Sequence, residues 1–258
     1  MFPHFHLFGF TIHTGSSLIF ASFVISYILF YFKLSNKISS LKIFIIALFT
    51  ASGAFFGARL FHVIFENVDY FIRNPSEVFS NFNGMTFYGA FFSGIFLFYF
   101  FTRIFVKKGV IRNQIWDIAS ICLAMTYGLM RIGCFASGCC WGKITPLPWS
   151  VQYYHPSSRM PFKGIPVHPV QMYDSFLGFA IMAFLVYADK RRLFKEGDLI
   201  WIFIIFYTIG RFITEFFRGD AFRGDSIFLG LSTSQVISVV LLFLAISRQF
   251  VFADKKKV

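Results

Sequence analysis

The sequence predicts an all-α polytopic membrane protein with about seven transmembrane helices. Of its 258 residues, 57% are hydrophobic and 22% are aromatic, whereas only 14% are charged. Soluble domains are about a quarter charged and somewhat less than half apolar, and a soluble core of this size has no room for 41 Phe residues. Lipid must therefore solvate many of these side chains, and the length suits one domain spanning residues 1–258.

Seven stretches are apolar and long enough to cross a bilayer, which takes about 20 residues of helix. They lie at residues 14–32, 43–65, 85–106, 114–130, 172–188, 199–217 and 229–250, and none is shorter than the fourth. The N-terminal residues lack the charged segment, apolar core and cleavage site of a signal peptide. We therefore expect the first helix to insert uncleaved.

Basic residues collect in alternate loops between these spans. Fifteen of the 24 Lys and Arg residues lie at the end of the first, third, fifth or last span or in the segment that follows it. Because basic loops remain cytoplasmic, we expect the N-terminus outside and the C-terminus in the cytoplasm. We therefore interpret the net charge of +12 as a result of this topology. Anionic membrane lipid is the expected electrostatic partner of these basic residues. We expect no nucleic-acid partner.

Several charged residues lie within or beside the apolar spans, where charge is costly and usually functional. Arg131 ends the fourth span, and Arg211, Glu215 and Arg218 lie at the outer end of the sixth. Arg211 and Glu215 are four residues apart on one helical face and can pair. Ion pairs that lock the helices, or arginines that reach the interface, are one interpretation. An anion site is the other, because the guanidinium fork binds phosphate bidentately.

The segment at residues 131–171 is expected to lie outside and to line the site, because irregular backbone at membrane depth must be buried or face a cavity. It contains Cys134, Cys139 and Cys140. An oxidising compartment favours a disulfide among them. Buried thiols, a thiol–disulfide enzyme and a metal site are the alternatives. We expect no metal, since the cluster lacks a well-spaced second group of ligands.

Three motifs in this half of the chain resemble the prolipoprotein diacylglyceryl transferase family. They read RIGCFASGCCWGK at 131–143, HPVQMYD at 168–174 and GRFITEFFRGD at 210–220. Shorter matches, FGFTIHTG at 8–15, GMTFYG at 84–89 and LSTSQ at 231–235, extend the resemblance along the chain. The sequence departs from the family pattern where it has Tyr88 for histidine, Cys134 for asparagine, Cys139 for glutamate and Asp174 for glutamate.

The resemblance implies an enzyme that transfers a diacylglyceryl group from phosphatidylglycerol to the lipobox cysteine thiol of prolipoproteins and releases glycerol phosphate. It implies a multi-pass protein of the bacterial plasma (inner) membrane, with phosphatidylglycerol and prolipoprotein signal peptides as partners and no cofactor. Catalytic roles are expected for Arg131, Arg211 and Glu215. The residues expected to bind substrate are Tyr88, Gly89, His168, Gln171, Tyr173, Arg218 and Gln235.

Three other functions stay open at this point. The same fold can act on a different acceptor, since three signature residues are replaced, at Tyr88, Cys134 and Cys139. The cysteines allow a membrane thiol–disulfide enzyme. A transporter would show two related halves with interrupted helices, and no such repeat is evident.

Overall fold

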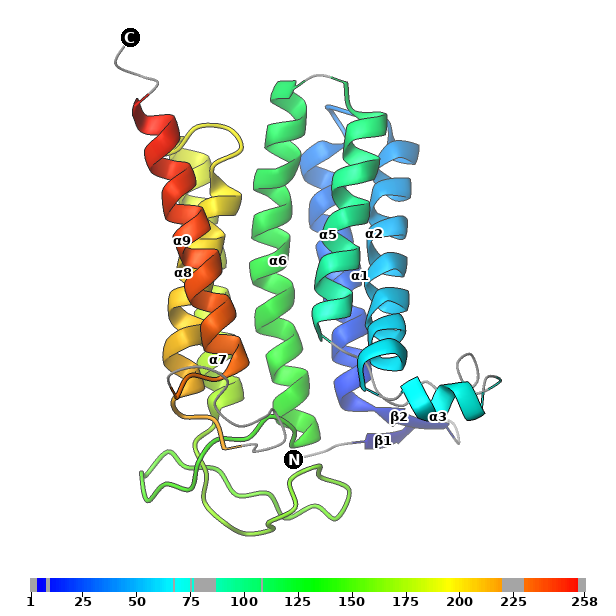
Figure 1. The fold of residues 1–258 in the computed structure, drawn as a ribbon, viewed down its shortest axis with the longest axis vertical. Helices are drawn as coiled ribbons and strands as arrows, with labels where there is room; N and C mark the ends of the chain where they lie inside the picture. Colours follow the sequence, from blue (N-terminus) through cyan, green and yellow to red (C-terminus); the bar gives the residue numbers. More distant parts are fainter. Residues whose placement is uncertain are drawn as a thin grey trace. The chain divides into compact units, whose positions relative to one another are not determined.

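Seven long helices account for most of the structure, a computed structural model that describes residues 4–7, 10–66, 68–74, 76, 87–107, 109–219 and 230–254. Within these residues the helices follow one another as shown in Figure 1: α1 (Thr14–Leu34), α2 (Ser40–Phe61), α5 (Phe87–Phe105), α6 (Gly109–Ser137), α7 (Val170–Arg191), α8 (Leu199–Glu215) and α9 (Thr233–Asp254). A π-helical turn, η1 (His62–Glu66), and a short helix, α3 (Val68–Arg73), follow α2. Four helices, α1, α2, α6 and α7, are long and apolar enough to cross a membrane, and α5 and α9 contain shorter apolar stretches. The chain is therefore a polytopic helical membrane protein, as predicted.

The helices follow the predicted spans in order, although residues 85–86 and 229 of two spans lie outside the described residues. The prediction was wrong for the fourth span, because α6 has 29 residues and is the longest described helix. The span at 114–130 stopped at the charge of Arg131, which stays inside α6 beside a buried carboxylate. A two-stranded antiparallel hairpin, β1 (His4–Leu7) and β2 (Phe10–His13), was not predicted. The membrane orientation stays a prediction.

The chain forms two compact units, Met1–Ile28 with Asn113–Val258, and Leu29–Arg112. In the second unit α2 packs closely along α5. A Cβ atom at Gly89 would overlap the carbonyl group of Gly57, so glycine is what allows the two backbones to meet. Small residues serve this purpose at many membrane helix interfaces. The single-domain organisation over residues 1–258 stays a prediction.

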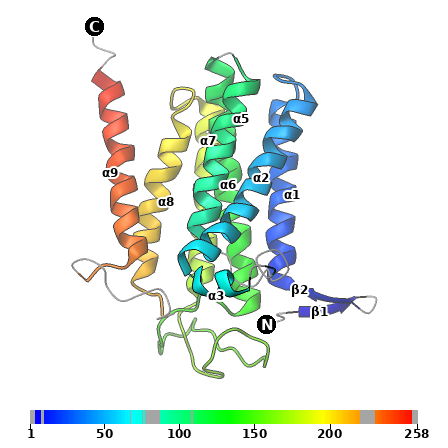
Figure 2. The same cartoon turned by 45° about the vertical axis from the view of Figure 1, so that its right-hand side comes forward.

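In the first unit, α7 packs on α8 and α8 packs on α9 (Figures 1 and 2). Gly128 of α6 meets Gly178 of α7, where a Cβ on Gly178 would lie 2.7 Å from the Gly128 nitrogen. The end of α6 and the start of α7 lie at the same end of these helices (Figure 1). Arg131 is three residues beyond Gly128, and Asp174 is four residues before Gly178. Because each helical residue adds a rise of about 1.5 Å, the two side chains lie at similar distances from the glycine contact. Both lie on the side of that contact where α6 ends and α7 begins.

The connection between α6 and α7 contains no described helix and holds a small core of its own. Trp141, Tyr153, Met160 and Val167 are buried together in it. Residues 131–137, the start of the segment expected to be external, are helical and form the last turns of α6. Their helical hydrogen bonding continues because the charge of Arg131 is balanced within the protein.

Two backbone pairings attach this connection to the ends of α7 and α8. The Gly142 N–H donates to the carbonyl oxygen of His168 at 3.1 Å, and the Lys143 N–H donates to that of Phe217 at 2.8 Å. The Gly219 N–H donates to the carbonyl oxygen of Trp141 at 3.1 Å. These bonds bring the cysteine-containing turn, the start of α7 and the end of α8 to one place.

Candidate functional site

Three buried charged side chains from three helices meet at this end of the first unit. The carboxylate oxygen Oδ2 of Asp174 lies 3.3 Å from Arg131 Nε and 3.9 Å from Arg211 Nη1. Asp174 is fully buried, and Arg131 and Arg211 are 8% and 5% exposed. Charges so far from water are stable only when they are paired. The arrangement therefore fixes two arginines side by side around one carboxylate.

Glu215 extends this group toward α9. It accepts a hydrogen bond from Arg211 Nη2, which confirms the pairing predicted from their spacing, and another at 3.0 Å from the Ser232 hydroxyl. Gln235 Oε1 in turn accepts from the backbone N–H of Ser232 at 3.0 Å. Gln235 thus holds the turn before α9, and through Ser232 it supports the carboxylate that orients Arg211.

The guanidinium of Arg131 keeps much of its hydrogen-bonding capacity. Its contacts among the described residues are the Asp174 carboxylate and the ring of Tyr127, whose centroid is 5.1 Å from the Arg131 Cζ. Neither oxygen of Asp174 accepts a well-aligned hydrogen bond from a described residue. The pair is thus held by charge at short range, without the closed two-bond fork that arginine makes with a carboxylate. Donors of such a guanidinium remain able to bind another anion.

His168 and Tyr173 belong to an aromatic group beside these charges. His168 Nδ1 lies 3.2 Å from the Tyr173 hydroxyl, which also accepts a hydrogen bond from Trp149 Nε1 at 2.9 Å. The Phe217 ring packs against both His168 and Tyr173. The orientation of the imidazole is thereby set by the hydroxyl of Tyr173 and the face of Phe217.

The remaining predicted site residues have different surroundings. Gln171 is fully buried, and its Nε2 donates to the Cys139 carbonyl oxygen at 2.6 Å and to the Tyr153 hydroxyl at 3.0 Å. Burial raises the pKa of Tyr153. Arg218 is buried just beyond α8. Gly89 packs against α2 in the second unit, and the side chain of Tyr88 lies outside the described structure.

The three clustered cysteines lie together at the end of α6. Their sulfur atoms are all within 4.8 Å of one another, and none of them forms a disulfide in the described structure. Hydrogen bonds from the thiols of Cys134 and Cys139 lower the pKa of Cys140, and Arg131 and Arg218 act in the same direction. Hydrogen bonds with the thiols of Cys134 and Cys140, together with burial, raise the pKa of Cys139. The disulfide stays a prediction.

Asp174 is the residue that the sequence analysis left out of the site. The sequence did contain an indication of its role, because an acidic residue one turn into an apolar helix is energetically costly unless it has a cationic partner. The partner was not evident, since Arg131 and Arg211 lie 43 and 37 positions away along the chain. Thr214, whose hydroxyl lies 3.4 Å from Arg211 Nη1, was missed as well.

Comparison with known proteins identifies the family of this chain. The family described as prolipoprotein diacylglyceryl transferase matches residues 3–251. A phosphatidylglycerol–prolipoprotein diacylglyceryl transferase of Clostridium tetani is 33% identical over 252 residues, which is 96% of this chain and 95% of that protein. Similar proteins of the same name from Clostridium perfringens and Geobacter sulfurreducens are 31% and 28% identical, over 78% and 80% of this chain and 75% and 76% of their own lengths. The chain belongs to the prolipoprotein diacylglyceryl transferase family.

Proposed function

We propose that this protein transfers the diacylglyceryl group of phosphatidylglycerol to the lipobox cysteine of prolipoproteins, at the bacterial inner membrane. Membership of the family and the names of its relatives support the reaction. The observation that supports a site for it is the pair of buried arginines around Asp174. Phosphatidylglycerol and the signal peptides of prolipoproteins are the proposed partners.

The reaction is a substitution at a glycerol carbon. The acceptor thiolate forms a C–S bond with that carbon while the bond from the carbon to a phosphodiester oxygen breaks. The electron pair leaves with the oxygen, so glycerol phosphate departs with more negative charge than the diester carried. Cations placed where this charge develops lower the barrier, since they are oriented before the reaction begins.

Arg131 and Arg211 are the proposed ligands of the phosphate. Both are buried, and arginine presents its donors in a rigid fork that matches phosphate oxygens. Asp174 keeps the two cations together against their mutual repulsion, and Glu215 orients Arg211. Arg218, just beyond the end of α8, is proposed to add a third positive contact for the head group or the peptide.

An apolar cavity of about 190 Å³ between α8 and α9, partly open to the surroundings, supports the proposal of a place for an acyl chain. Thr208, on its wall, is one helical turn from Arg211, so a lipid phosphate held by Arg211 has the cavity within reach of its tails. The lining residues are Thr208, Ile209, Phe212, Ile213, Ser238, Val239 and Leu242.

The acceptor thiol has an ordinary pKa of about 8.5, so a neighbouring base or positive field must favour its thiolate. His168 is the proposed proton acceptor, and Tyr173 orients its ring. Gln171 and Gln235 are proposed to act through the loops that their side chains hold. Head-group binding by Tyr88 and Gly89 stays a prediction.

Expression in cells depleted of their own transferase tests the proposal. A reporter prolipoprotein should gain the mass of a diacylglyceryl group. Arg131→Ala and Arg211→Ala should each lower this conversion by about 100-fold or more, the effect of removing one preorganised donor. Arg191→Ala, an exposed arginine at the far end of α7, is the matched control and should convert the reporter normally. An unmodified reporter in cells that contain the intact protein in their membrane would refute the proposed reaction.

A further inference from the structure

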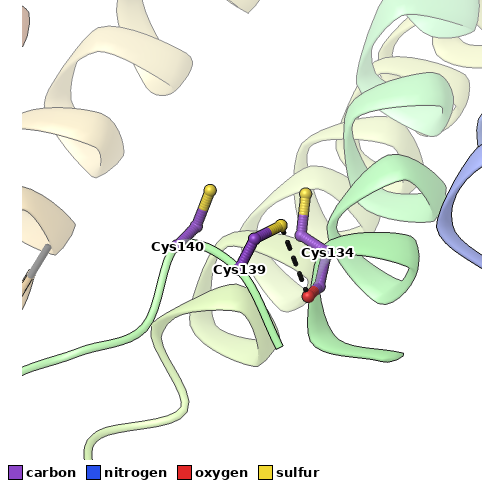
Figure 3. A group of neighbouring side chains, drawn as sticks. All are labelled: Cys134, Cys139 and Cys140. Carbon is purple, nitrogen blue, oxygen red and sulfur yellow. Dashed lines mark hydrogen bonds between the residues drawn. The ribbon is translucent and has the colours of Figure 1, made fainter. Parts of the chain in front are cut away.

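The three cysteines at the end of α6 are not used by the proposed reaction, yet the backbone around them is built to bring their sulfur atoms together. In Figure 3 the side chains of Cys134, Cys139 and Cys140 extend toward the same side. Their sulfur atoms lie within 4.8 Å of one another. Each residue is partly buried. The cluster is therefore sheltered without being closed to small solutes.

The close approach of Cys134 and Cys139 follows from the way α6 ends. The Cys139 N–H donates to the Cys134 carbonyl oxygen at 3.1 Å, and the Gly138 N–H donates to that of Phe135 at 3.2 Å. Gly138 has a φ of 68°. These are the bonds of a Schellman cap, which places the side chains at its first and last positions in contact. The cap explains why two cysteines five positions apart in sequence meet.

The cap does not explain the third thiol. Cys140 also adopts a left-handed backbone, with a φ of 61°, which residues other than glycine seldom adopt. The preceding peptide is held in place by Gln171, whose Nε2 donates to the Cys139 carbonyl oxygen at 2.6 Å. A strained residue that the surrounding structure holds in one conformation is typical of a functional position. Here the strain turns a third sulfur toward the other two.

Three thiolates at this separation suit a soft metal cation. Zinc–sulfur bonds of about 2.3 Å place the sulfurs of one tetrahedral site about 3.8 Å apart. The three sulfur atoms therefore need to move only slightly closer together to bind one cation. Thiolates select Zn²⁺ and Cu⁺ over harder cations. Arg131 and Arg218 are close enough to act electrostatically on Cys140, and their positive charges offset the excess negative charge of three thiolates on one cation.

We propose that Cys134, Cys139 and Cys140 bind one soft cation, Zn²⁺ or Cu⁺, through three thiolates. Each thiol releases its proton to solvent as its metal–sulfur bond forms, and no electron transfer is needed. Among the described residues no other His, Cys, Asp or Glu joins the group, so the protein supplies three ligands and leaves a coordination position open. This site differs from the expectation of no metal, which rested on the lack of a well-spaced second group of ligands. The inference does not rest on the proposed transfer reaction.

The test uses the purified full-length protein in detergent with its thiols reduced. Separate samples are loaded with Zn²⁺ or Cu⁺, desalted, and measured for metal per chain. We expect one equivalent to be retained for at least one cation, and the two samples identify which. Single Ser variants of Cys134, Cys139 and Cys140 should each weaken retention by about tenfold or more, since replacing even a residue that only supports a metal ligand costs that much. Cys122→Ser is the matched control and should retain the full equivalent.

A second measurement needs no variant and so does not depend on the folding of any. The bound cation should slow alkylation of all three clustered thiols in the wild-type protein, as read by mass spectrometry of peptides. The proposal is overturned if the wild-type protein, with all its thiols confirmed as reduced, retains neither Zn²⁺ nor Cu⁺ after desalting. Retention that is unchanged in all three variants, or a Cys134–Cys139 disulfide in protein isolated from native membranes under non-reducing conditions, also overturns it.

Discussion

A buried aspartate lies near each end of α6, Asp117 at the first end and Asp174 of α7 at the other. The two carboxylates have different hydrogen-bond partners. At the first end, the Asp117 carboxylate accepts hydrogen bonds from the backbone N–H groups of Gly197 and Leu199, at 2.7 and 3.0 Å. At the other end, Arg131 faces Asp174, whose oxygens accept no aligned hydrogen bond from a described residue. One carboxylate accepts a backbone hydrogen bond on each of its oxygens, from the residues that precede and begin α8. The other is held only by neighbouring cations.

This difference separates a structural group from a candidate catalytic one. Asp117 accepts hydrogen bonds from two backbone N–H groups at the start of α8, as the side chain of a helix-capping residue does. Asp174 and Arg131 are in contact without an aligned hydrogen bond, which suits the proposed binding of a lipid phosphate by Arg131. Buried charge alone would rank the two aspartates equally, and the hydrogen bonding distinguishes them.

The largest effect is expected at the Asp174 end. Asp174→Asn removes the charge that holds Arg131 and Arg211 together, and we expect reporter conversion to fall by about 100-fold or more, as for loss of a preorganised charge. Asp174→Glu keeps the charge and should retain most of the conversion. Equal activity of the Asn variant and wild type, with equal amounts in the membrane, would show that this carboxylate does not position the arginines.

A smaller effect is expected when the helices are displaced without any change of charge. Gly178→Ala puts a methyl group 2.7 Å from the Gly128 nitrogen. The resulting separation of α6 from α7 lengthens the Arg131–Asp174 contact, and small misplacements of a reacting group cost up to about 100-fold in rate. We expect a loss of about tenfold, within that limit. Gly109→Ala, at the open start of α6, is the matched control, and an equal loss there would assign the effect to helix stability instead.

A still smaller effect is expected in the cavity between α8 and α9. Val239→Trp fills space beside Ile209, so lipids with long acyl chains should be used a few-fold less well and lipids with short chains nearly normally. Val240→Trp, on the neighbouring exposed position of α9, is the matched control. Conversion assays with lipids of defined chain length read the difference. No chain-length dependence in the Val239 variant argues against an acyl chain in this cavity.

The smallest effect on activity is expected at the Asp117 end. Asp117→Ala leaves the N–H groups of Gly197 and Leu199 without their acceptor, which costs about 1–3 kcal/mol of stability. Thermal unfolding in detergent should therefore occur at a lower temperature, while conversion per folded molecule stays within about twofold of wild type, because the site is at the other end of α6. A fall in specific activity as large as that of Asp174→Asn would erase the distinction between the two ends.

Most of the fold could be predicted from the sequence, because lipid imposes a simple length and polarity requirement on each helix. A predicted span was wrong where a charged residue within a helix is balanced by another buried charge. Arg131 ended the predicted fourth span, but α6 continues to Ser137 because Asp174 balances the charge. The β1–β2 hairpin has only four residues in each strand, and its apolar sequence carries no strong turn signal.

The site was predictable where it depended on local spacing. The Arg211–Glu215 pair follows from one helical turn, and it is present. The Arg131–Asp174 pair depends on how α6 and α7 align at Gly128 and Gly178, which spacing along the chain does not reveal. The meeting of three thiols likewise depends on a helix cap and on the left-handed backbone of Cys140.

The most direct measurement uses the purified protein in bilayer discs with a synthetic lipobox peptide. With phosphatidylglycerol in the bilayer, the peptide should gain one diacylglyceryl group for each glycerol phosphate released, and in discs without this lipid it should stay unmodified. Asp174→Asn should abolish the gain, whereas Asp117→Ala, corrected for its folded fraction, should preserve it. A folded wild-type protein that leaves the peptide mass unchanged in phosphatidylglycerol discs would contradict the proposed reaction.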